Sequence, residues 1–577
     1  MIQYPNDQSA ILTFIAPYKK NVYVVGEFNH WQILDEYLME KLEDGETFTI
    51  TILNLEPQKE YAYQFLIDGK IAVADPYCEK ILDPQFDQYI SENTYPGLKP
   101  YPKENPFKGT VSVLQTSQAP YQWQTTTFVP PPKQNLVTYE LLIRDFVESR
   151  KYRDVANYIP YFKKLGINAI ELMPVNEFTG NDSWGYNPTF FFAADKAYGT
   201  KDDLKFLIDK CHENGIAVIL DVAFNHADKK FSYYKAYSAQ SKLQKDNPFF
   251  NLKATHPFSV FFDFNHESKY TQNFFYDVCR FWLEEYKIDG FRFDLSKGFT
   301  QIKSDPDVDF WSKYDESRVI LLKRLYDNIR SYSQSSYLIL EHLSANDEET
   351  VLADYGFMLW GHLNHQFRNL VKGIKDDISG LNYKNRGWKE PNLVGYMESH
   401  DEERLVYDAN TKLKNLNRVL QRAKTAAIVF FAYPGPKLIW QFGEFGYDVD
   451  INLNGRTGVK PAKWEYLEQK ERRELFEVYA QMIRLKVFNE AFSNGDFSEQ
   501  SDGLIKKIII NHPEMNTRIM ANFGLKAVTI KSNLETGQWY DFFGEKEIRV
   551  VKRNMEIKLN EGECYLFTSK RMNKYIL

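Results

Sequence analysis

The sequence lacks the features that mark several large classes of protein. None of its 577 residues belongs to a run of the roughly 18 apolar residues that a membrane span needs. No run of five or more like charges offers a surface to nucleic acid or anionic lipid. The four cysteines lie far apart and form no C-x-x-C pair, which argues against a zinc site and a disulfide framework. Neither G-x-x-x-x-G-K-S/T nor G-x-G-x-x-G is present, so the phosphate-binding loops of nucleotide enzymes are missing.

Charge and composition favour a neutral ligand. The formal net charge is −7, which is mild for this length, and aromatic residues make up 16% of the chain. Aromatic side chains suit surfaces that stack on sugars as well as ordinary cores. The first residues, MIQYPNDQSAILTF, have no basic region followed by a sustained apolar segment, so we expect a cytoplasmic protein. The length predicts about three domains.

Segments of short strands flank the middle of the chain. Residues 1–105 alternate short apolar runs with turn residues such as Asp68-Gly69, which is typical of a β-sandwich. Residues 106–135 are rich in proline, which neither a helix nor a central strand accommodates, and are interpreted as a linker. Residues 489–577 return to short strands and predict a second β-sandwich.

Residues 136–488 change to short apolar runs that alternate with amphipathic helices, the pattern of a parallel sheet covered by helices. Eight such units predict an α/β fold, a (β/α)8 TIM barrel, with a doubly wound open sheet as the alternative. An insertion at 227–268 predicts a small lobe after the third strand. Thr200 followed by Asp203 indicates a capped helix start. The strand candidates are 137–143, 169–175, 217–225, 290–296, 337–343, 357–361, 393–399 and 437–444.

Acidic residues stand at the ends of several of these strands, although strands buried on both faces disfavour them. The carboxyl ends of barrel strands are where active sites lie. Arg292 and Asp294 are two residues apart and share one face of their strand, so the guanidinium is expected to lower the pKa of Asp294 and hold it ionised. Glu341 follows the apolar run YLIL, and a carboxyl group in dry surroundings keeps its proton to higher pH. Asp401 stands at the end of the seventh strand, after His400.

Two carboxyl groups with opposite protonation preferences are the apparatus of glycoside hydrolysis, in which one attacks and the other donates a proton. A retaining mechanism needs them about 5 to 5.5 Å apart. Any one of these acids taken alone is as readily a helix cap or a surface ion pair. Three of them at the ends of different strands favour a shared active site.

Several segments together resemble the α-amylase superfamily of glycoside hydrolases. DVAFNH (221–226), GFRFDLSK (290–297), Glu341 and ESHD (398–401) are similar to the family's motifs on strands three, four, five and seven. SWGYNP (183–188) and PGPKLIWQFGEFGYD (434–448) are similar to further family segments. The N-terminal VYVVGEFNHW (22–31) resembles the glycogen-associated sandwich that precedes some barrels of this family. In that module Trp31 either binds glucan or packs against the barrel, and we favour packing.

The resemblance implies a role for each matching acid. Asp294 is the implied nucleophile and Glu341 the implied acid/base. Asp401 is implied to hold sugar hydroxyls and to stabilise the transition state.

The same resemblance implies five substrate-binding residues: Tyr186, His226, Arg292, Lys297 and His400. Tyr186 is implied to stack on the sugar at the cleaved bond, and the two histidines to hydrogen-bond its hydroxyls. Arg292 is implied to support the nucleophile, and Lys297 to contact the leaving-group side. A single histidine without this context is more often structural.

No cofactor is required by the implied chemistry. Asn225 matches a position that helps to bind calcium in many amylases, which permits Ca²⁺, although the insertion shows no cluster of oxygen ligands. The sequence departs from the common amylase pattern at Gly298, where a histidine is frequent, and at His342-Leu343 after the acid/base.

We therefore expect a retaining glycoside hydrolase that cleaves internal α-1,4 bonds of starch- or glycogen-type glucans through a covalent glycosyl-aspartate. The alternatives are α-1,4-glucan branching transfer through the same intermediate, and debranching or maltooligosaccharide-specific hydrolysis. A non-catalytic glucan-binding scaffold is the remaining alternative, but such a protein would be expected to have lost one of the acids. The expected partner is an α-glucan, with no nucleic acid and no membrane, and the protein is expected to be a monomer or homodimer.

Overall fold

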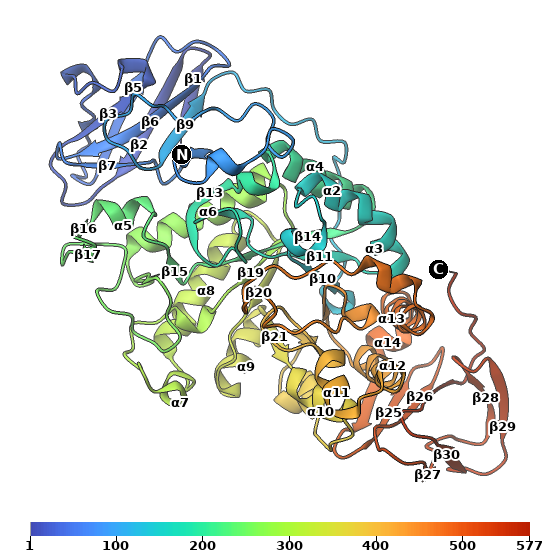
Figure 1. Ribbon diagram of the computed structural model, residues 1–577. Helices are drawn as coiled ribbons and strands as arrows, with labels where there is room; N and C mark the ends of the chain where they lie inside the picture. Colours follow the sequence, from blue (N-terminus) through green and yellow to red (C-terminus); the bar gives the residue numbers. More distant parts are fainter. Residues whose placement is uncertain (1, 577) are drawn as a thin grey trace.

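The computed structural model describes residues 2–576, and the middle of the chain forms a closed barrel of eight parallel strands (Figure 1). The last strand pairs with the first and closes the ring. Each strand overlaps one of the eight predicted runs, so the barrel is confirmed and the open sheet is excluded. In barrel order the strands are β10 (Val137–Leu141), β11 (Ala169–Leu172), β14 (Ala217–Val222), β19 (Gly290–Phe293), β20 (Tyr337–Leu340), β21 (Met358–His362), β22 (Leu393–Tyr396) and β23 (Lys437–Trp440).

Amphipathic helices cover the outside of the barrel. Helix α4 (Lys201–Glu213) begins at the capping box predicted from Thr200 and Asp203, where each side chain accepts a hydrogen bond from the other residue's backbone N–H. Cys211 on α4 and Cys279 on α6 (Lys269–Glu285) are buried, and all four cysteines are free thiols. The main helices are α2 (Tyr152–Val155), α3 (Ile159–Leu165), α4 (Lys201–Glu213), α6 (Lys269–Glu285), α8 (Glu316–Arg330), α9 (Asn346–Tyr355), α10 (Asn364–Val371), α11 (Leu405–Leu413), α12 (Leu416–Ala432) and α13 (Lys470–Phe488).

The N-terminal segment forms two facing antiparallel sheets at one end of the molecule (Figure 1). Phe14 and Phe65 stack between them, with ring centroids 4.7 Å apart. One sheet contains β1 (Gln3–Asn6), β2 (Ser9–Ile15), β5 (Thr47–Ile52) and β4 (Glu40–Lys41). The other contains β3 (Val22–Gly26), β6 (Glu60–Ile67), β9 (Val111–Gln115) and β8 (Ile81–Leu82), with β7 (Ile71–Val73) paired to β6.

Two expectations for this sandwich need correction. The predicted linker 106–135 contains β9, which pairs with β6 in the middle of the second sheet, because the apolar run VSVLQ lies between the prolines. Trp31 neither faces the barrel nor offers a surface to glucan. It is 5% exposed and packs with Val25 and Leu66 on the outer face of the sheet that contains β3 and β6.

The insertion at 227–268 forms a small lobe between the sandwich and the barrel mouth. It contains α5 (Ser232–Ala236) and the hairpin β16 (Ser238–Ala239) and β17 (Lys242–Leu243). Strand β18 (Phe262–Asp263) returns to pair with β15 (His226–Ala227), which follows β14. Tyr233 of α5 stacks on Phe14 of the sandwich, with centroids 5.8 Å apart. The lobe is therefore tied to both neighbours.

The C-terminal segment forms antiparallel sheets at the opposite end of the molecule (Figure 1). Its larger sheet contains, in order, β24 (Asp496–Gln500), β25 (Ile505–Asn511), β26 (Thr517–Asn522), β31 (Cys564–Thr568), β28 (Gly537–Asp541) and β29 (Lys546–Val550). The smaller sheet pairs β27 (Val528–Lys531) with β30 (Glu556–Leu559). Within residues 2–576, no helix combines the length and the apolar character needed to cross a membrane.

Candidate active site

The carboxyl ends of β14, β19 and β20 bring three carboxylates to one guanidinium. Arg292, fully buried on β19, contacts Asp221 at the end of β14 through Nη1 at 2.9 Å. The same nitrogen donates to Asp294 Oδ1 at 2.9 Å, and Nη2 lies 2.9 Å from Glu341 Oε2. The guanidinium stacks on Trp360 of β21, 3.9 Å from the ring centroid. Asp294 and Glu341 therefore lie beside a single arginine head group at the barrel mouth.

Strained turns hold both acids immediately after their strands. Leu295 follows Asp294 with a left-handed φ of +45°, and its N–H donates to Glu341 Oε2 at 2.9 Å. Leu343, two residues after Glu341, is also left-handed, with φ of +50°. Such a backbone is costly for a branched side chain and persists where the surrounding structure fixes a functional group. The predicted strands 290–296 and 337–343 end earlier than expected because these turns begin there.

The charge state of Asp294 differs from the prediction. Burial raises the pKa of Asp294 well above its usual range, the Glu341 carboxylate raises it further, and Arg292 lowers it only in part. The prediction assigned one guanidinium to one carboxylate, whereas Arg292 is shared with Glu341 and Asp221. Burial likewise raises the pKa of Asp221 to about 6 despite Arg292. Nor does Glu341 lie in dry surroundings, since it contacts Arg292 and the Leu295 N–H. Asp294 and Glu341 therefore share one guanidinium and do not lie in separate surroundings.

His400 places a second positive charge beside this cluster. Its Nδ1 donates to Glu140 Oε1 at 2.5 Å, and its Nε2 lies 3.4 Å from Asp401 Oδ2. Although burial lowers it, Asp401 and Glu140 together raise the pKa of His400 to about 10, so the ring is charged at neutral pH. Although burial raises it, the His400 charge holds the pKa of Asp401 below its usual range. The Asp401 side chain is 39% exposed, so an ionised carboxylate faces the open site.

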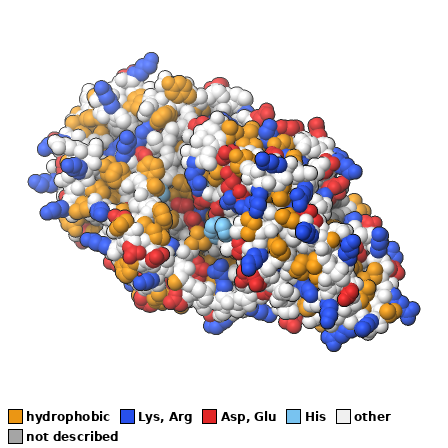
Figure 2. All heavy atoms as spheres, turned by 60° about the horizontal axis from the view of Figure 1, so that its bottom comes forward, with side chains coloured by type: hydrophobic (Ala, Val, Ile, Leu, Met, Phe, Trp, Pro, Cys, Tyr) orange, Lys and Arg blue, Asp and Glu red, His pale blue; other side chains and the backbone are white. Residues whose placement is uncertain are grey.

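Tyr186 and His226 are brought to the same place. Tyr186 lies between β12 (Asn176–Phe178) and β13 (Pro188–Ala194), and its hydroxyl donates to Asp221 Oδ2 at 2.5 Å. Its ring stacks on His400, with centroids 5.2 Å apart. His226 Nε2 donates to the Tyr186 carbonyl at 2.7 Å, and burial lowers the pKa of His226. Figure 2 shows histidine and acidic side chains gathered in a hollow in the middle of one face of the molecule.

Lys297 lies beyond Glu341 and is held by the same turns. Its amine donates to the Leu343 carbonyl at 2.9 Å and to Ser312 Oγ at 3.1 Å. It also lies over the Trp311 ring, 4.1 Å from the centroid. Burial lowers the pKa of Lys297 to about 8. Lys297 therefore contacts both the turn that follows Glu341 and the ring of Trp311.

Apolar side chains face solvent beside Trp311 and His226. Phe258 is 67% exposed and lies 5.9 Å from Trp311, centroid to centroid. Phe261 is 52% exposed and lies 5.6 Å from His226. Both phenylalanines have left-handed backbones, with φ of +60° and +54°. Bulky residues rarely adopt this conformation, and exposed apolar rings often mark a binding surface. The loop therefore exposes these rings to solvent and does not bury them in the core.

An imidazole occupies the space beside Asn225. His256 Nε2 lies 3.1 Å from Asn225 Oδ1 and 3.3 Å from Asp263 Oδ1, so an imidazole fills the space between these oxygens. Gly298 is required there, since a Cβ atom would lie 2.0 Å from Asn225 Oδ1 and 2.7 Å from His256 Nε2. Calcium needs six or more oxygen ligands. Among residues 2–576, no group of three or more His, Cys, Asp or Glu side chains is arranged to hold a metal.

Sequence reasoning missed Asp221 and Glu140, which lie buried beneath the site and pair with Arg292 and His400. Both are charged residues inside barrel strands, 1% and 0% exposed. The mismatch between a buried strand and an acidic residue, which singled out Asp294, applies equally to AVILDV and VTYEL. Their partners, Arg292 and His400, lie far away in sequence and become visible only in the fold.

Comparison with known sequences agrees with this geometry. Residues 151–259 and 254–481 match the family described as "Alpha amylase, catalytic domain". The match covers more than half of the chain, and the chain belongs to the α-amylase family, glycoside hydrolase family 13. It is an enzyme that acts on α-glucans.

Similar proteins include two curated relatives and a solved structure. A malto-oligosyltrehalose trehalohydrolase of Saccharolobus solfataricus is 28% identical over 282 residues, which are 48% of this chain and 42% of the relative. A 1,4-α-glucan branching enzyme of Oceanobacillus iheyensis is 23% identical over 96% of this chain and 88% of its own length. A type I pullulanase of Bacillus subtilis, solved with maltose, superimposes with a TM-score of 0.72 at 17% identity, covering 98% of this chain and 85% of that one. The structural likeness shows the fold alone.

Proposed function

We propose that this enzyme cleaves internal α-1,4-glucosidic bonds of starch- or glycogen-type glucans with retention of configuration. The observation that carries the proposal is the shared arginine. Asp294 and Glu341 each lie 2.9 Å from a different nitrogen of Arg292, which supports their acting on one glycosyl centre. Retaining glycosidases place their two carboxyl groups about 5 to 5.5 Å apart for this purpose.

The contacts of Arg292 indicate which carboxylate oxygen of Asp294 attacks the sugar and which oxygen of Glu341 carries the proton. Arg292 engages Asp294 Oδ1, which leaves Oδ2 to attack the anomeric carbon. Arg292 and the Leu295 N–H engage Glu341 Oε2, which leaves Oε1 to carry the proton. As the ester between Asp294 and the sugar forms, the glycosidic C–O bond breaks and its oxygen takes the proton from Glu341. Glu341 then removes a proton from water, whose oxygen attacks the anomeric carbon and releases Asp294 as carboxylate.

The remaining predicted residues support binding of the glucosyl unit at the cleaved bond. Asp401 is ionised and open to solvent, which suits hydrogen bonds to sugar hydroxyls, and the charged His400 holds it in that state. Tyr186 is fixed by Asp221 and offers a ring face, while His226 supports its backbone. Lys297 contacts the turn that follows the proton donor, which supports a role on the leaving-group side.

Branching transfer is the second candidate, because one feature favours a sugar acceptor over water. The exposed ring of Phe258 lies beside Trp311, which Lys297 covers, and Leu343, whose carbonyl Lys297 contacts, is 39% exposed. The exposed ring of Phe261 lies beside His226. Apolar faces bind the carbon face of a pyranose and displace water that would otherwise hydrolyse the ester. The relative aligned over 96% of the chain is also a branching enzyme.

The two functions are separated by products from amylose, glycogen and pullulan tested side by side. Hydrolysis predicts new reducing ends from amylose together with rapid loss of iodine staining. New α-1,6 linkages without new reducing ends would replace the hydrolase proposal with transfer. Reducing ends from pullulan alone would point to debranching.

We also propose that the reaction proceeds without calcium, since the His256 ring lies between the two oxygens that a cation would need. Activity after exhaustive treatment with a chelator tests this. Activity that is lost and then restored by Ca²⁺ would refute it.

A further inference from the structure

His362 is the last residue of β21 and lies at the mouth of the barrel. The four residues before it are buried, whereas its side chain is 39% exposed. Side chains two residues apart on a strand point to the same face, so His362 shares its face with Trp360. Trp360 stacks on the Arg292 guanidinium, 3.9 Å from the ring centroid. His362 therefore lies on the face of β21 that overlooks Arg292, one step closer to the barrel mouth than Trp360.

Carboxylates beside both neighbouring strands act on the His362 ring. Burial lowers the pKa of His362, whereas the negative charges of Asp401 and Glu341 raise it. Glu341 follows β20 and Asp401 follows β22, and these two strands flank β21 in the barrel. In barrel order, the imidazole therefore stands between the predicted proton donor and the carboxylate that faces the open site.

Glu402 holds one nitrogen of this imidazole. Its Oε1 lies 3.3 Å from His362 Nε2 and accepts a hydrogen bond from the Tyr396 hydroxyl at 3.4 Å. Its Oε2 accepts a hydrogen bond from the Ser399 hydroxyl. The His362 ring also stacks on Tyr396, with centroids 5.7 Å apart. The other nitrogen, Nδ1, has no protein partner within residues 2–576. A side chain that is held in place and keeps one nitrogen available binds a ligand at a lower entropic cost.

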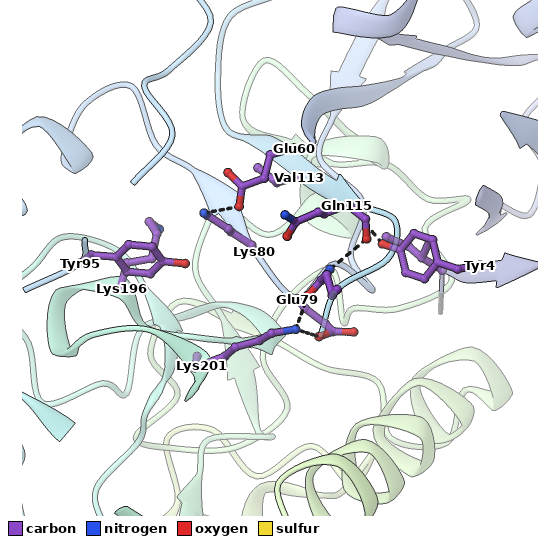
Figure 3. A pocket seen from close by; sticks show the side chains of 12 residues that line it. Tyr4, Glu60, Glu79, Lys80, Tyr95, Val113, Gln115, Lys196 and Lys201 are labelled. Carbon is purple, nitrogen blue, oxygen red and sulfur yellow. Dashed lines mark hydrogen bonds and ion pairs between the residues drawn. The ribbon is translucent and has the colours of Figure 1, made fainter. Parts of the chain in front are cut away.

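Other partly exposed ion pairs join separate parts of the chain, which this pair does not. In the crevice between the N-terminal sandwich and the barrel, Lys201 of α4 lies 3.3 Å from Glu79 (Figure 3). That contact connects two domains. His362 and Glu402 instead lie on β21 and after β22, two strands that their backbone hydrogen bonds already join. Because an exposed pair adds little stability by itself, the position of His362 at the barrel mouth favours a role in binding.

The leaving-group side of the cleaved bond is the place that suits His362. The departing sugar must lie next to Glu341, since Glu341 protonates its oxygen. Lys297, which follows β19, contacts the turn after Glu341. His362 stands on β21, on the other side of β20. A sugar beside Glu341 is therefore flanked by Lys297 and His362.

We propose that His362 hydrogen-bonds a hydroxyl group of the glucosyl unit on the leaving-group side of the cleaved bond, and that Glu402 positions it. This inference deepens the proposed function and rests on it. An imidazole nitrogen donates to a hydroxyl or accepts from it, according to whether it carries a proton. The same contact serves the departing sugar in hydrolysis and the accepting sugar in transfer.

The test compares kcat/KM for maltohexaose, which places sugar on both sides of the cleaved bond, with kcat/KM for α-maltotriosyl fluoride, which has no sugar leaving group. The ratio of the two values does not depend on the amount of folded enzyme. His362→Phe keeps a ring against Tyr396 but removes both nitrogens. It should lower the ratio about fivefold to tenfold, which corresponds to one hydrogen bond.

Two further variants separate the hydrogen bond from the shape of the side chain. His362→Asn keeps a hydrogen-bonding group close to the backbone, near the place of Nδ1, and should restore most of the ratio. The matched control is His365→Phe, because His365 is 72% exposed on α10 and its Nε2 lies 4.0 Å from Asp376 Oδ2. This control should keep the wild-type ratio.

A double-mutant cycle tests the role of Glu402. Glu402→Leu should lower the same ratio, because the imidazole loses the carboxylate that holds it. In the double variant with His362→Phe the two losses should not add, since Glu402 acts through the imidazole. Additive losses would refute a positioning role for Glu402.

An unchanged ratio in His362→Phe would overturn the proposal. If kcat/KM for both substrates stays at the wild-type level, His362 makes no contact with the sugar. If both values fall equally, His362 acts on the side of the bond that the two substrates share. Turnover of neither substrate by the wild type would refute the proposed function itself, and this inference with it.

Discussion

Replacing Arg292 by glutamine removes the guanidinium that contacts Asp221, Asp294 and Glu341 while keeping much of the side chain's shape. Removing one partner of a buried ion pair costs about 3 to 5 kcal/mol of stability. Loss of a preorganised electrostatic contact lowers kcat by a factor of about 10² to 10³. We therefore expect a folded but less stable enzyme whose kcat/KM falls by at least that factor.

The pH profile distinguishes a catalytic loss from a purely structural one. Arg292 lowers the pKa of Asp294, so its removal raises that pKa further. Because the nucleophile must be ionised, the acidic limb of kcat/KM against pH should shift to higher pH. The control is Arg472→Gln, since Arg472 is equally buried, pairs with Asp448 at 2.9 Å and stacks on Tyr466 outside the site. An acidic limb that moves equally in both variants, or in neither, would refute the reasoning.

Three further predictions concern the surroundings of the site. Chelator should leave the apparent melting temperature of the wild type unchanged. His256→Ala should lower that temperature, because Asn225 and Asp263 lose their hydrogen-bonding partner. A melting temperature that falls with chelator and recovers with Ca²⁺ contradicts this prediction. Phe258→Ala should lower the ratio of transfer to hydrolysis, measured by incorporation of a labelled acceptor, and an unchanged ratio argues against a sugar platform there. His400→Gln removes a positive charge that lowers the pKa of Asp401, so a larger fraction of Asp401 is protonated at mildly acidic pH. Binding of maltooligosaccharides should therefore weaken more near about pH 5 than near about pH 8. Equal weakening at both pH values contradicts this prediction.

The order of elements and the main acids follow from the sequence because each leaves a local signal. A buried strand reads as an apolar run, and an acid at its end stands out against that run, which singled out Asp294, Glu341 and Asp401. The same signal was available for Asp221 and Glu140 within their strands. The run VSVLQ within 106–135 has prolines on either side, so the sequence pattern predicts a linker where the structure has β9.

Contacts between distant strands could not be predicted in this way. Spacing along GFRFDLS pairs Arg292 with Asp294, but the fold also places Asp221 directly opposite Arg292 on the neighbouring strand. Glu341 reaches the same guanidinium from the other side. Burial, followed by the nearby Glu341 carboxylate, raises the pKa of Asp294 more than Arg292 lowers it, and spacing along one strand shows neither cause.

The most direct test of the central claim uses a glycosyl fluoride, whose leaving group departs without a proton. In Glu341→Gln, α-maltotriosyl fluoride should form the ester, and loss of the general base should slow its hydrolysis enough for the ester to accumulate. Mass spectrometry of the digested protein should then find one maltotriosyl group on the peptide that contains Asp294. The double variant that carries both Glu341→Gln and Asp294→Asn should show none. A sugar on another residue, or turnover of the fluoride with inverted configuration and no adduct, would contradict the assignment of Asp294 and Glu341 to one glucosyl bond.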